Sequence, residues 1–169
     1  MTDFISIEKV YGILEDAIAP EASVESFPLE QALGRVLAET LTSPGDVPPF
    51  NNSAMDGFAF NSAELDKGAS VSLLVRGTSY AGTPWEGTLA SGEAVRIMTG
   101  AATPEGADTV IPFERTETVE ENGSTYVVFE AGRVRPAENV RLRGEELRAG
   151  DAVMEPGIVL TPAYLGLAA

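Results

Sequence analysis

The sequence predicts an α+β protein that is mostly β, and three features of the chain carry this prediction. Near the N-terminus, apolar residues recur every three or four positions over two stretches, which is the spacing of an amphipathic helix. From residue 48 onwards, short apolar or alternating runs follow one another, separated by Gly and Pro. The pair Asn122-Gly123 lies between two of these runs, as in a two-residue β-hairpin.

The first expected helix covers residues 6–19, and the second covers residues 29–41. Ser6 is a suitable N-cap for the first helix, and Pro20 ends it. Pro28 precedes the second helix, which stops before Ser43-Pro44-Gly45. The apolar faces are Ile7, Val10, Tyr11, Leu14, Ala17 and Ile18 in the first helix, and Leu29, Ala32, Leu33, Val36 and Leu37 in the second.

Short strands are expected through the middle of the chain, at residues 58–60, 71–76, 94–98, 109–113, 116–120 and 125–129. A second hairpin is predicted at the C-terminal end, where Pro156-Gly157 separates residues 152–154 from residues 158–160. Thr161-Pro162 then has the pattern of an N-cap followed by proline at the first helical position. Because the sequence stops soon after this helix begins, we expect the chain to be a piece of a longer polypeptide.

Composition restricts the chemistry that this chain can perform. In 169 residues, 11 Lys and Arg face 26 Asp and Glu, for a net charge of −15, which argues against nucleic acid or an anionic membrane as a partner. The absence of Cys and His excludes disulfides, thiolate and imidazole metal sites, and Ser-His-Asp catalysis. Carboxylates remain, and they suit hard cations such as Mg²⁺. With no secretory signal and no apolar run of roughly 18 residues, we expect a cytoplasmic protein of one domain, or two at most.

Two polar loops are candidates for a functional site. In residues 48–59, Asp56 precedes Gly57, where a carboxylate can reach a cation or a substrate hydroxyl. In residues 96–108, Thr99 follows an expected strand and can offer its hydroxyl to an anion. Taken alone, each loop is more typical of an ordinary connection: an Asp-Gly turn in the first case and a strand-end threonine in the second.

The third and fourth candidates lie in the C-terminal part. Five arginines gather within sixteen positions and can bind phosphate or carboxylate: Arg133, Arg135, Arg141, Arg143 and Arg148. The alternative is a solvated face that offsets the acidic surface, or pairing with Glu145 and Glu146. Gly144-Glu145-Glu146 can supply one cation ligand, although these residues taken alone are more typical of a solvated turn.

Three sequence blocks, taken in order, resemble the molybdopterin molybdenumtransferase family, the MoeA family, which includes the E domain of gephyrin. They are PPFNNSAMDGFA, RIMTGAATPEGADTVIPFE and NVRLRGEELRAGDAVMEPGIVLTPAYLGLAA. The resemblance also takes in QALGRVLAE and so runs over nearly the whole chain. It implies insertion of molybdate into adenylylated molybdopterin with release of AMP, assisted by Mg²⁺ or another divalent cation.

The resemblance also implies a domain plan and a partner. Residues 27–47 and 136–169 would form an elongated dimerisation domain of helices and short hairpins, and residues 48–135 a small β-rich lid domain inserted in it. The helix of residues 1–26 would pack near an α/β domain that lies beyond this segment. The active cleft would form between that α/β domain of one subunit and the loops of the other, so a homodimer is expected, and the isolated chain is expected to be inactive.

Family roles transfer to particular residues of this chain. The resemblance implies catalytic roles for Asp56, Thr99 and Glu146, with Asp56 also as the cation ligand. It implies substrate binding by Asn52, Ser53, Gly57, Gly100 and Arg141. Glu114 matches an acidic residue of the family that comes directly after the strand expected at residues 109–113. Glu146 stands where some members carry Asp, and Asn51 replaces an Asp common in relatives, with the loss of one charge.

Two other functional hypotheses stay open at this point. The chain can be a scaffolding or dimerisation module, as in gephyrin, without catalysis. It can also be a generic acidic β domain whose motif matches are accidental.

Overall fold

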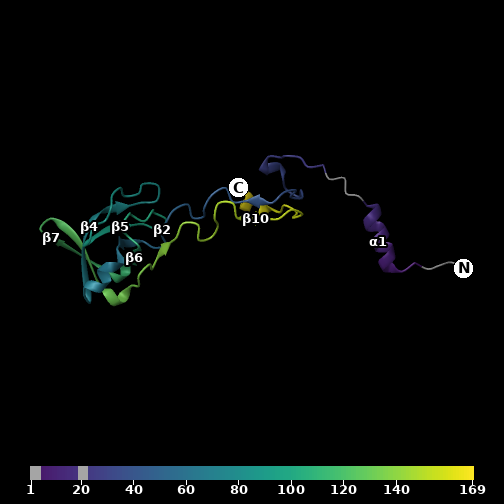
Figure 1. The fold of residues 1–169 in the computed structure, drawn as a ribbon. Helices are drawn as coiled ribbons and strands as arrows, with labels where there is room; N and C mark the ends of the chain where they lie inside the picture. The colour runs from purple at the N-terminus through teal and green to yellow at the C-terminus, as the bar shows by residue number, and fades with distance from the viewer. Residues whose placement is uncertain (1–4, 19–22) are drawn as a thin grey trace. The chain divides into compact units, whose positions relative to one another are not determined.

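The computed structural model describes residues 5–18 and 23–169, in which the chain forms two compact units (Figure 1). Unit 1 combines Met1–Leu41 with Met154–Ala169, and unit 2 is the intervening segment Thr42–Val153. Most of the regular structure consists of strands, which confirms the mostly β character that the sequence predicts.

Unit 2 contains a six-stranded sheet in the order β6-β3-β5-β4-β8-β7. Neighbouring strands are antiparallel except β4 and β5, which are parallel. The strands are β3 (Gly57–Phe60), β4 (Ser70–Ser79), β5 (Glu93–Ile97), β6 (Thr109–Pro112), β7 (Glu117–Glu121) and β8 (Ser124–Glu130). All six expected strands are therefore confirmed, with ends that shift by at most three residues.

The hairpin between β7 and β8 has the turn that its sequence predicts. Asn122 has a φ of 51° and Gly123 a φ of 79°, so both central residues are left-handed, as a type I′ turn requires. Glu121 and Ser124 form the last pair of the two strands. This local signal fixes the register of the outer strands.

Two apolar clusters form the core of unit 2, one of which is built mainly on β3, β4 and β8. Its fully buried residues include Phe60, Leu73 and Val127. The 3₁₀ turns η2 (Ser62–Lys67) and η4 (Ala131–Arg133) pack Leu65 and Ala131 against it. The second cluster consists of Ala59, Ile97, Ala101 and Val110. Since alternate strand residues point to opposite faces, the sheet buries apolar residues on both sides.

Unit 1 contains the first expected helix, α1 (Ile7–Ala17). Ser6 caps it by accepting a hydrogen bond of 3.3 Å from the Lys9 N–H, as predicted. Every side chain of α1 is exposed, including Ile7, Tyr11 and Leu14 of its apolar face. Pro20, the expected end of this helix, lies outside the described residues.

The second expected helix, residues 29–41, is wrong. Only one 3₁₀ turn forms, η1 (Leu29–Gln31), and Gly34 then takes a left-handed φ of 76°. Beyond it the backbone pairs with a distant segment: the Gly34 N–H donates to the Leu160 oxygen at 2.8 Å, and the Leu37 N–H to the Ile158 oxygen at 2.9 Å. Long-range strand-like pairing has overridden a helical apolar pattern.

The predicted hairpin around Pro156-Gly157 is also wrong. β10 (Ala152–Met154) pairs with β1 (Leu41–Thr42), and Val159 pairs with Val36, so both arms of the expected hairpin pair with the same earlier segment. Pro156-Gly157 does form a turn, but the chain continues along its partner because the Gly157 N–H donates to the Leu37 oxygen at 2.8 Å.

The last element, α2 (Pro162–Ala168), begins as the sequence predicts. Thr161 is its N-cap, Pro162 occupies the first turn, and the Tyr164 N–H donates to the threonine hydroxyl at 3.4 Å. Across residues 5–18 and 23–169, neither α1 nor α2 has the length and apolar character that a membrane crossing demands.

Candidate functional site

The loop of residues 51–57 lies at the centre of the candidate site, in unit 2. On one side it pairs with residues 100–103, where the Ser53 N–H donates to the Ala101 oxygen at 3.0 Å and the Gly100 N–H to the Ser53 oxygen at 2.8 Å. On the other side, β2 (Asn52–Ser53) pairs with β9 (Val140–Arg141), which sets Asn52 opposite Arg141. The fold therefore brings all three sequence blocks together around this one loop.

Asp56 and Thr99 are in direct contact. Oδ1 of Asp56 accepts two hydrogen bonds of 2.7 Å, one from the backbone N–H of Thr99 and one from its hydroxyl. These bonds, the backbone one foremost, lower the pKa of Asp56 below its ordinary value, and the nearby Arg96 charge acts in the same direction. The exposed carboxylate is therefore ionised at neutral pH, and both hydrogen bonds fall on one of its oxygens.

Ser53 and the two glycines shape this loop. The Ser53 hydroxyl is buried, donates to the Met55 oxygen at 2.5 Å and accepts the Met55 N–H at 3.3 Å, so it closes the turn before Asp56. Gly57 lies against the next strand so closely that a Cβ would be 2.0 Å from the Ile111 oxygen. Gly100 has a φ of 79°, which favours glycine in the turn after Thr99.

The two asparagines hold the start of the loop. Asn52 is buried, and its amide donates to the Phe50 oxygen at 3.4 Å. Asn51 accepts the Arg143 N–H at 2.8 Å through its side-chain oxygen. Here the neutral amide joins the loop to the C-terminal block, which is a contact that a carboxylate can also make.

Arg141 is paired with two carboxylates. Its Nε donates to Glu145 at 3.0 Å, and its Nη2 donates to Glu146. The Glu145 bond and the Glu146 charge raise the pKa of Arg141, and the Leu142 N–H foremost lowers the pKa of Glu145. Glu146 thus lies beside Arg141, and Arg141 beside Asn52, so these three predicted residues are neighbours.

The five arginines do not form one cluster. Arg143 pairs with Asp46, and Arg133 pairs with Glu130, each apart from the Arg141 pairs. β9 ends at Arg141, so Arg143 lies beyond the strand. These exposed pairs agree with the alternative in which most of the arginines offset acidic neighbours.

The backbone next to Glu114 contacts that of Asp56, because the N–H of the preceding residue, Phe113, donates to the backbone oxygen of Asp56 at 3.2 Å. It lies in the turn η3 (Phe113–Arg115) and is exposed. In the part of the chain that the structure describes, no three acidic side chains are grouped closely enough to hold a metal ion by themselves. Asp56 is therefore suited to be one ligand among others, not the centre of an all-protein metal cage.

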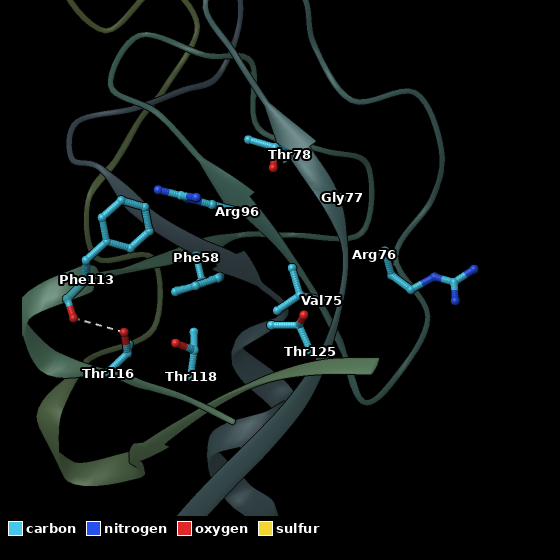
Figure 2. Close-up of a pocket in the computed structure, with 10 residues that line it drawn as sticks. All are labelled: Phe58, Val75, Arg76, Gly77, Thr78, Arg96, Phe113, Thr116, Thr118 and Thr125. Carbon is cyan, nitrogen blue, oxygen red and sulfur yellow. Dashed lines mark hydrogen bonds between the residues drawn. The ribbon is translucent and has the colours of Figure 1, made fainter. Parts of the chain in front are cut away.

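Sequence reasoning missed a pocket of about 610 Å³ on the sheet (Figure 2). Its lining comes from five strands, η3 and the residue between η3 and β7: Phe58, Val75, Arg76, Gly77, Thr78, Arg96, Phe113, Thr116, Thr118 and Thr125. Arg96 also belongs to the surroundings of Asp56, so the pocket and the loop site are adjacent. Strand pairing assembles these residues, and no run in the sequence signals it.

Comparison with known proteins identifies the family. Residues 5–169 match the family model described as MoeA N-terminal region (domain I and II). The chain is 43% identical over 141 residues to a molybdopterin molybdenumtransferase of Haemophilus influenzae, covering 83% of this chain and 33% of the relative. It is 36% identical over 152 residues to a protein of the same name from Bacillus subtilis, covering 88% and 35%.

Solved structures of molybdopterin biosynthesis MoeA protein from Pyrococcus horikoshii are similar as well. One has a TM-score of 0.82 at 30% identity and covers 98% of this chain and 41% of its own, and another has a TM-score of 0.73 at 31% identity, covering 85% and 37%. The chain spans about a third of the length of the curated relatives it matches. The resemblance seen in the three sequence blocks is therefore confirmed, and the chain belongs to the MoeA N-terminal region family.

Proposed function

We propose that this chain is the N-terminal part of a molybdopterin molybdenumtransferase, which inserts molybdate into adenylylated molybdopterin and releases AMP. The observation that carries the proposal is the direct contact of Asp56 with Thr99, within a region 43% identical to a protein of that name. These two residues are 43 positions apart and come from two different loops, and neither side chain belongs to the buried core.

Asp56 is proposed as the ligand for the divalent cation, Mg²⁺. Its lowered pKa keeps the carboxylate charged, and Thr99 holds one of its oxygens in a fixed direction. Mg²⁺ ordinarily takes only one or two protein carboxylates and fills its remaining positions with water and substrate phosphates. A single exposed carboxylate fits that demand, and the bound cation would supply charge neutralisation for the phosphate groups of the substrate.

Substrate contacts are proposed for the loop and its two neighbours. Arg141 can turn from its carboxylate partners to an anionic group of the substrate, because its ion pairs are partly exposed and therefore weak. Glu146 would then be released for catalysis. The residues Asn52, Ser53, Gly57 and Gly100 present the loop backbone to the substrate, and their own bonds keep that backbone in place.

A second copy of the chain is proposed as the partner that completes the active cleft. Residues 27–47 and 136–169 would form the dimerisation domain, and residues 48–135 the inserted lid domain. Support comes from unit 1, where the paired residues Val36 and Val159 are 59% and 53% exposed and Leu33 is 58% exposed. Adjacent exposed apolar side chains are typical of a surface that another chain covers.

Two further proposals follow from this reading. The whole protein works in the cytoplasm, and the 169-residue chain is inactive alone because the α/β domain that holds most of the molybdopterin contacts is not among its residues. The scaffolding alternative is not favoured, because the curated relatives described above are named as transferases.

A chimera tests the proposal. This chain replaces the matching region of the Haemophilus influenzae relative, and molybdate insertion is measured as AMP release from adenylylated molybdopterin. We expect the chimera to turn over, the isolated chain to be inactive, and Asp56→Asn in the chimera to lose at least about 100-fold in rate, because loss of a ligand should cost at least as much as the roughly 10–100-fold lost when a residue that only orients a ligand is changed.

The matched control is Asp66→Asn, which removes one exposed carboxylate of the same unit in η2, away from the site. It is expected to leave the rate unchanged. A folded chimera that works equally well with Asn at position 56 overturns the role of Asp56, and turnover by the isolated chain overturns the need for the other domain.

A further inference from the structure

The pocket of Figure 2 borders the core cluster that contains Phe58 and Leu73, because Phe58 belongs to both. Strand register sets Phe58 of β3 opposite Arg96 of β5, and Arg96 beside Thr78 of β4, so these three form a row across the sheet. Val75 lies three residues before Thr78 in β4 and packs against the core cluster that contains Leu73. The pocket thus has an apolar floor beside the core and a polar end at Arg96.

An irregularity in β4 helps to form the hollow. The register between β4 and β5 shifts between Val75 and Thr78, which leaves Arg76 and Gly77 out of step. A Cβ on Gly77 would lie 2.8 Å from the Trp85 ring, so the indole packs on the bare backbone at this point. In Figure 2 the Arg76 side chain points away from the other lining residues, and it pairs with Glu93 at 3.3 Å.

Arg96 is held in place by an aromatic side chain. Its guanidinium lies 4.9 Å from the centroid of the Phe113 ring, and that ring meets Phe58 edge to face at 5.3 Å. Among the described residues, no carboxylate oxygen lies within ion-pair distance of Arg96. Its donors are therefore available to a ligand, unlike those of Arg141 and Arg143.

The remaining polar groups of the pocket are hydroxyls. Thr116 donates to the Phe113 oxygen at 2.9 Å, and Thr125 donates to Glu120 at 2.5 Å. Thr78 and Thr118 complete the set. None of the ten lining residues is acidic, in a chain whose net charge is −15. Such a lining selects against cations and favours a group that accepts many hydrogen bonds.

We propose that this pocket binds a small aromatic phosphate. The ring would lie on the apolar floor of Phe58 and Val75, beside Phe113, and the phosphate would accept bonds from Arg96 and from the hydroxyls of Thr78 and Thr118. A phosphate suits this end better than a carboxylate, because it can accept more bonds from the guanidinium and hydroxyls together. The volume of about 610 Å³ lies within the range of small-molecule sites.

Binding of phenyl phosphate to the 169-residue chain, followed by amide chemical shifts in NMR, tests the proposal. We expect saturable binding at millimolar concentrations, with shifts at Arg96, Phe113 and Thr118. Inorganic phosphate and benzyl alcohol, which each carry half of the chemistry, are expected to bind at least about tenfold more weakly, since ring and anion contacts both contribute.

Arg96→Gln is expected to weaken phenyl phosphate at least about tenfold, because it removes the charge-assisted bonds. Arg133→Gln is the control: it removes the same charge from an exposed arginine paired with Glu130, and is expected to leave the affinity unchanged. Thr118→Val provides a second variant of unchanged size, expected to weaken binding about threefold by loss of one hydroxyl bond.

Equal affinity of wild type and Arg96→Gln, an equal loss in Arg133→Gln, or shifts confined to residues outside the pocket would overturn the proposal. Should Arg96→Gln fail to fold, unchanged binding by Thr118→Val together with absent shifts at Phe113 does the same. The result is independent of molybdate insertion by the chimera, so either proposal can fail without the other.

Discussion

The two units place their apolar residues in different environments. In unit 2, large side chains such as Phe60, Leu73 and Ile111 are fully buried by the unit itself. In the described part of unit 1, the buried apolar residues are Ala32, Met154 and Leu160, and the face of α1 is exposed. Since burial of apolar area is the main source of folding free energy, we expect unit 2 to be able to fold as an independent domain. Unit 1 has apolar surface left for another chain or domain.

The largest expected effect is a loss of stability in unit 2. Gly57→Ala places a Cβ 2.0 Å from the Ile111 oxygen, a backbone atom that cannot move without displacing β6. We expect the free energy of unfolding to fall by roughly 3 kcal/mol or more. Denaturant unfolding followed by the fluorescence of Trp85, which is the single tryptophan and lies in unit 2, measures this.

The control for Gly57→Ala is Gly132→Ala in the same unit, where a Cβ meets no atom within 4 Å. We expect its unfolding free energy to stay within about 0.5 kcal/mol of wild type. A Gly57→Ala chain as stable as this control would show that β3 and β6 are not so closely packed.

The second effect concerns the exposed face of unit 1. Val159→Lys puts a charge on the proposed dimer surface, where Val159 pairs with Val36. Because a buried unpaired charge opposes association, we expect self-association to weaken at least about tenfold in sedimentation equilibrium. Val119→Lys makes the same change at an exposed valine of β7 in unit 2, and should leave the dimer intact.

The contrast between the units also explains what the sequence could predict. The strands of the six-stranded sheet and the turn at Asn122-Gly123 follow from local signals, namely short apolar or alternating runs and two residues that accept a positive φ, whereas the short strands β2 and β9 were not predicted. The prediction of the second helix was wrong because Leu29–Leu37 has a helical apolar spacing, whereas the left-handed Gly34 and the pairing with residues 157–160 determine the backbone of this segment. Pairing over 120 positions or more leaves no mark on local periodicity.

The candidate site divides in the same way. Asp56 and Thr99 could be singled out from residue type and resemblance, and their contact had to come from the fold. The pocket could not be predicted at all, because Phe58, Thr78 and Arg96 become neighbours only through the order β3-β5-β4. The sequence shows which residues carry suitable chemical groups, but the strand register must be known before one can say which of these groups are neighbours.

A smaller effect tests the Asp56–Thr99 contact by pH. Thr99→Val removes the hydroxyl bond and keeps the backbone N–H, so the pKa of Asp56 should rise, while remaining below its ordinary value. A carboxyl whose folded pKa is lowered contributes stability above its unfolded pKa, and that contribution is lost as pH falls through the folded pKa. The stability difference between wild type and Thr99→Val should therefore be full above about pH 4 and shrink in more acidic solution.

Carbon NMR titration of the Asp56 carboxyl measures the pKa directly, and Thr99→Ser serves as the control because it keeps both donors. We expect serine to leave the pKa of Asp56 near the wild-type value. An equal rise with serine and valine would mean that the methyl group, and not the hydroxyl bond, holds the carboxyl.

The smallest effect returns to α1, whose exposed side chains leave it without support from the rest of the described chain. An isolated helix of 11 residues is marginal in water, so its population depends on intrinsic propensity. Gly12 meets no atom within 4 Å of an added Cβ, and Gly12→Ala should stabilise the helix by about 0.5–1 kcal/mol. Helical content by circular dichroism should rise, while the unfolding midpoint seen by Trp85 stays unchanged.

Gly34→Ala, at a left-handed φ of 76°, should instead destabilise the paired segments of unit 1 in which Val36 lies opposite Val159. A shift of the Trp85 midpoint on Gly12→Ala would mean that α1 and unit 2 unfold together, and the contrast between the two units would no longer hold.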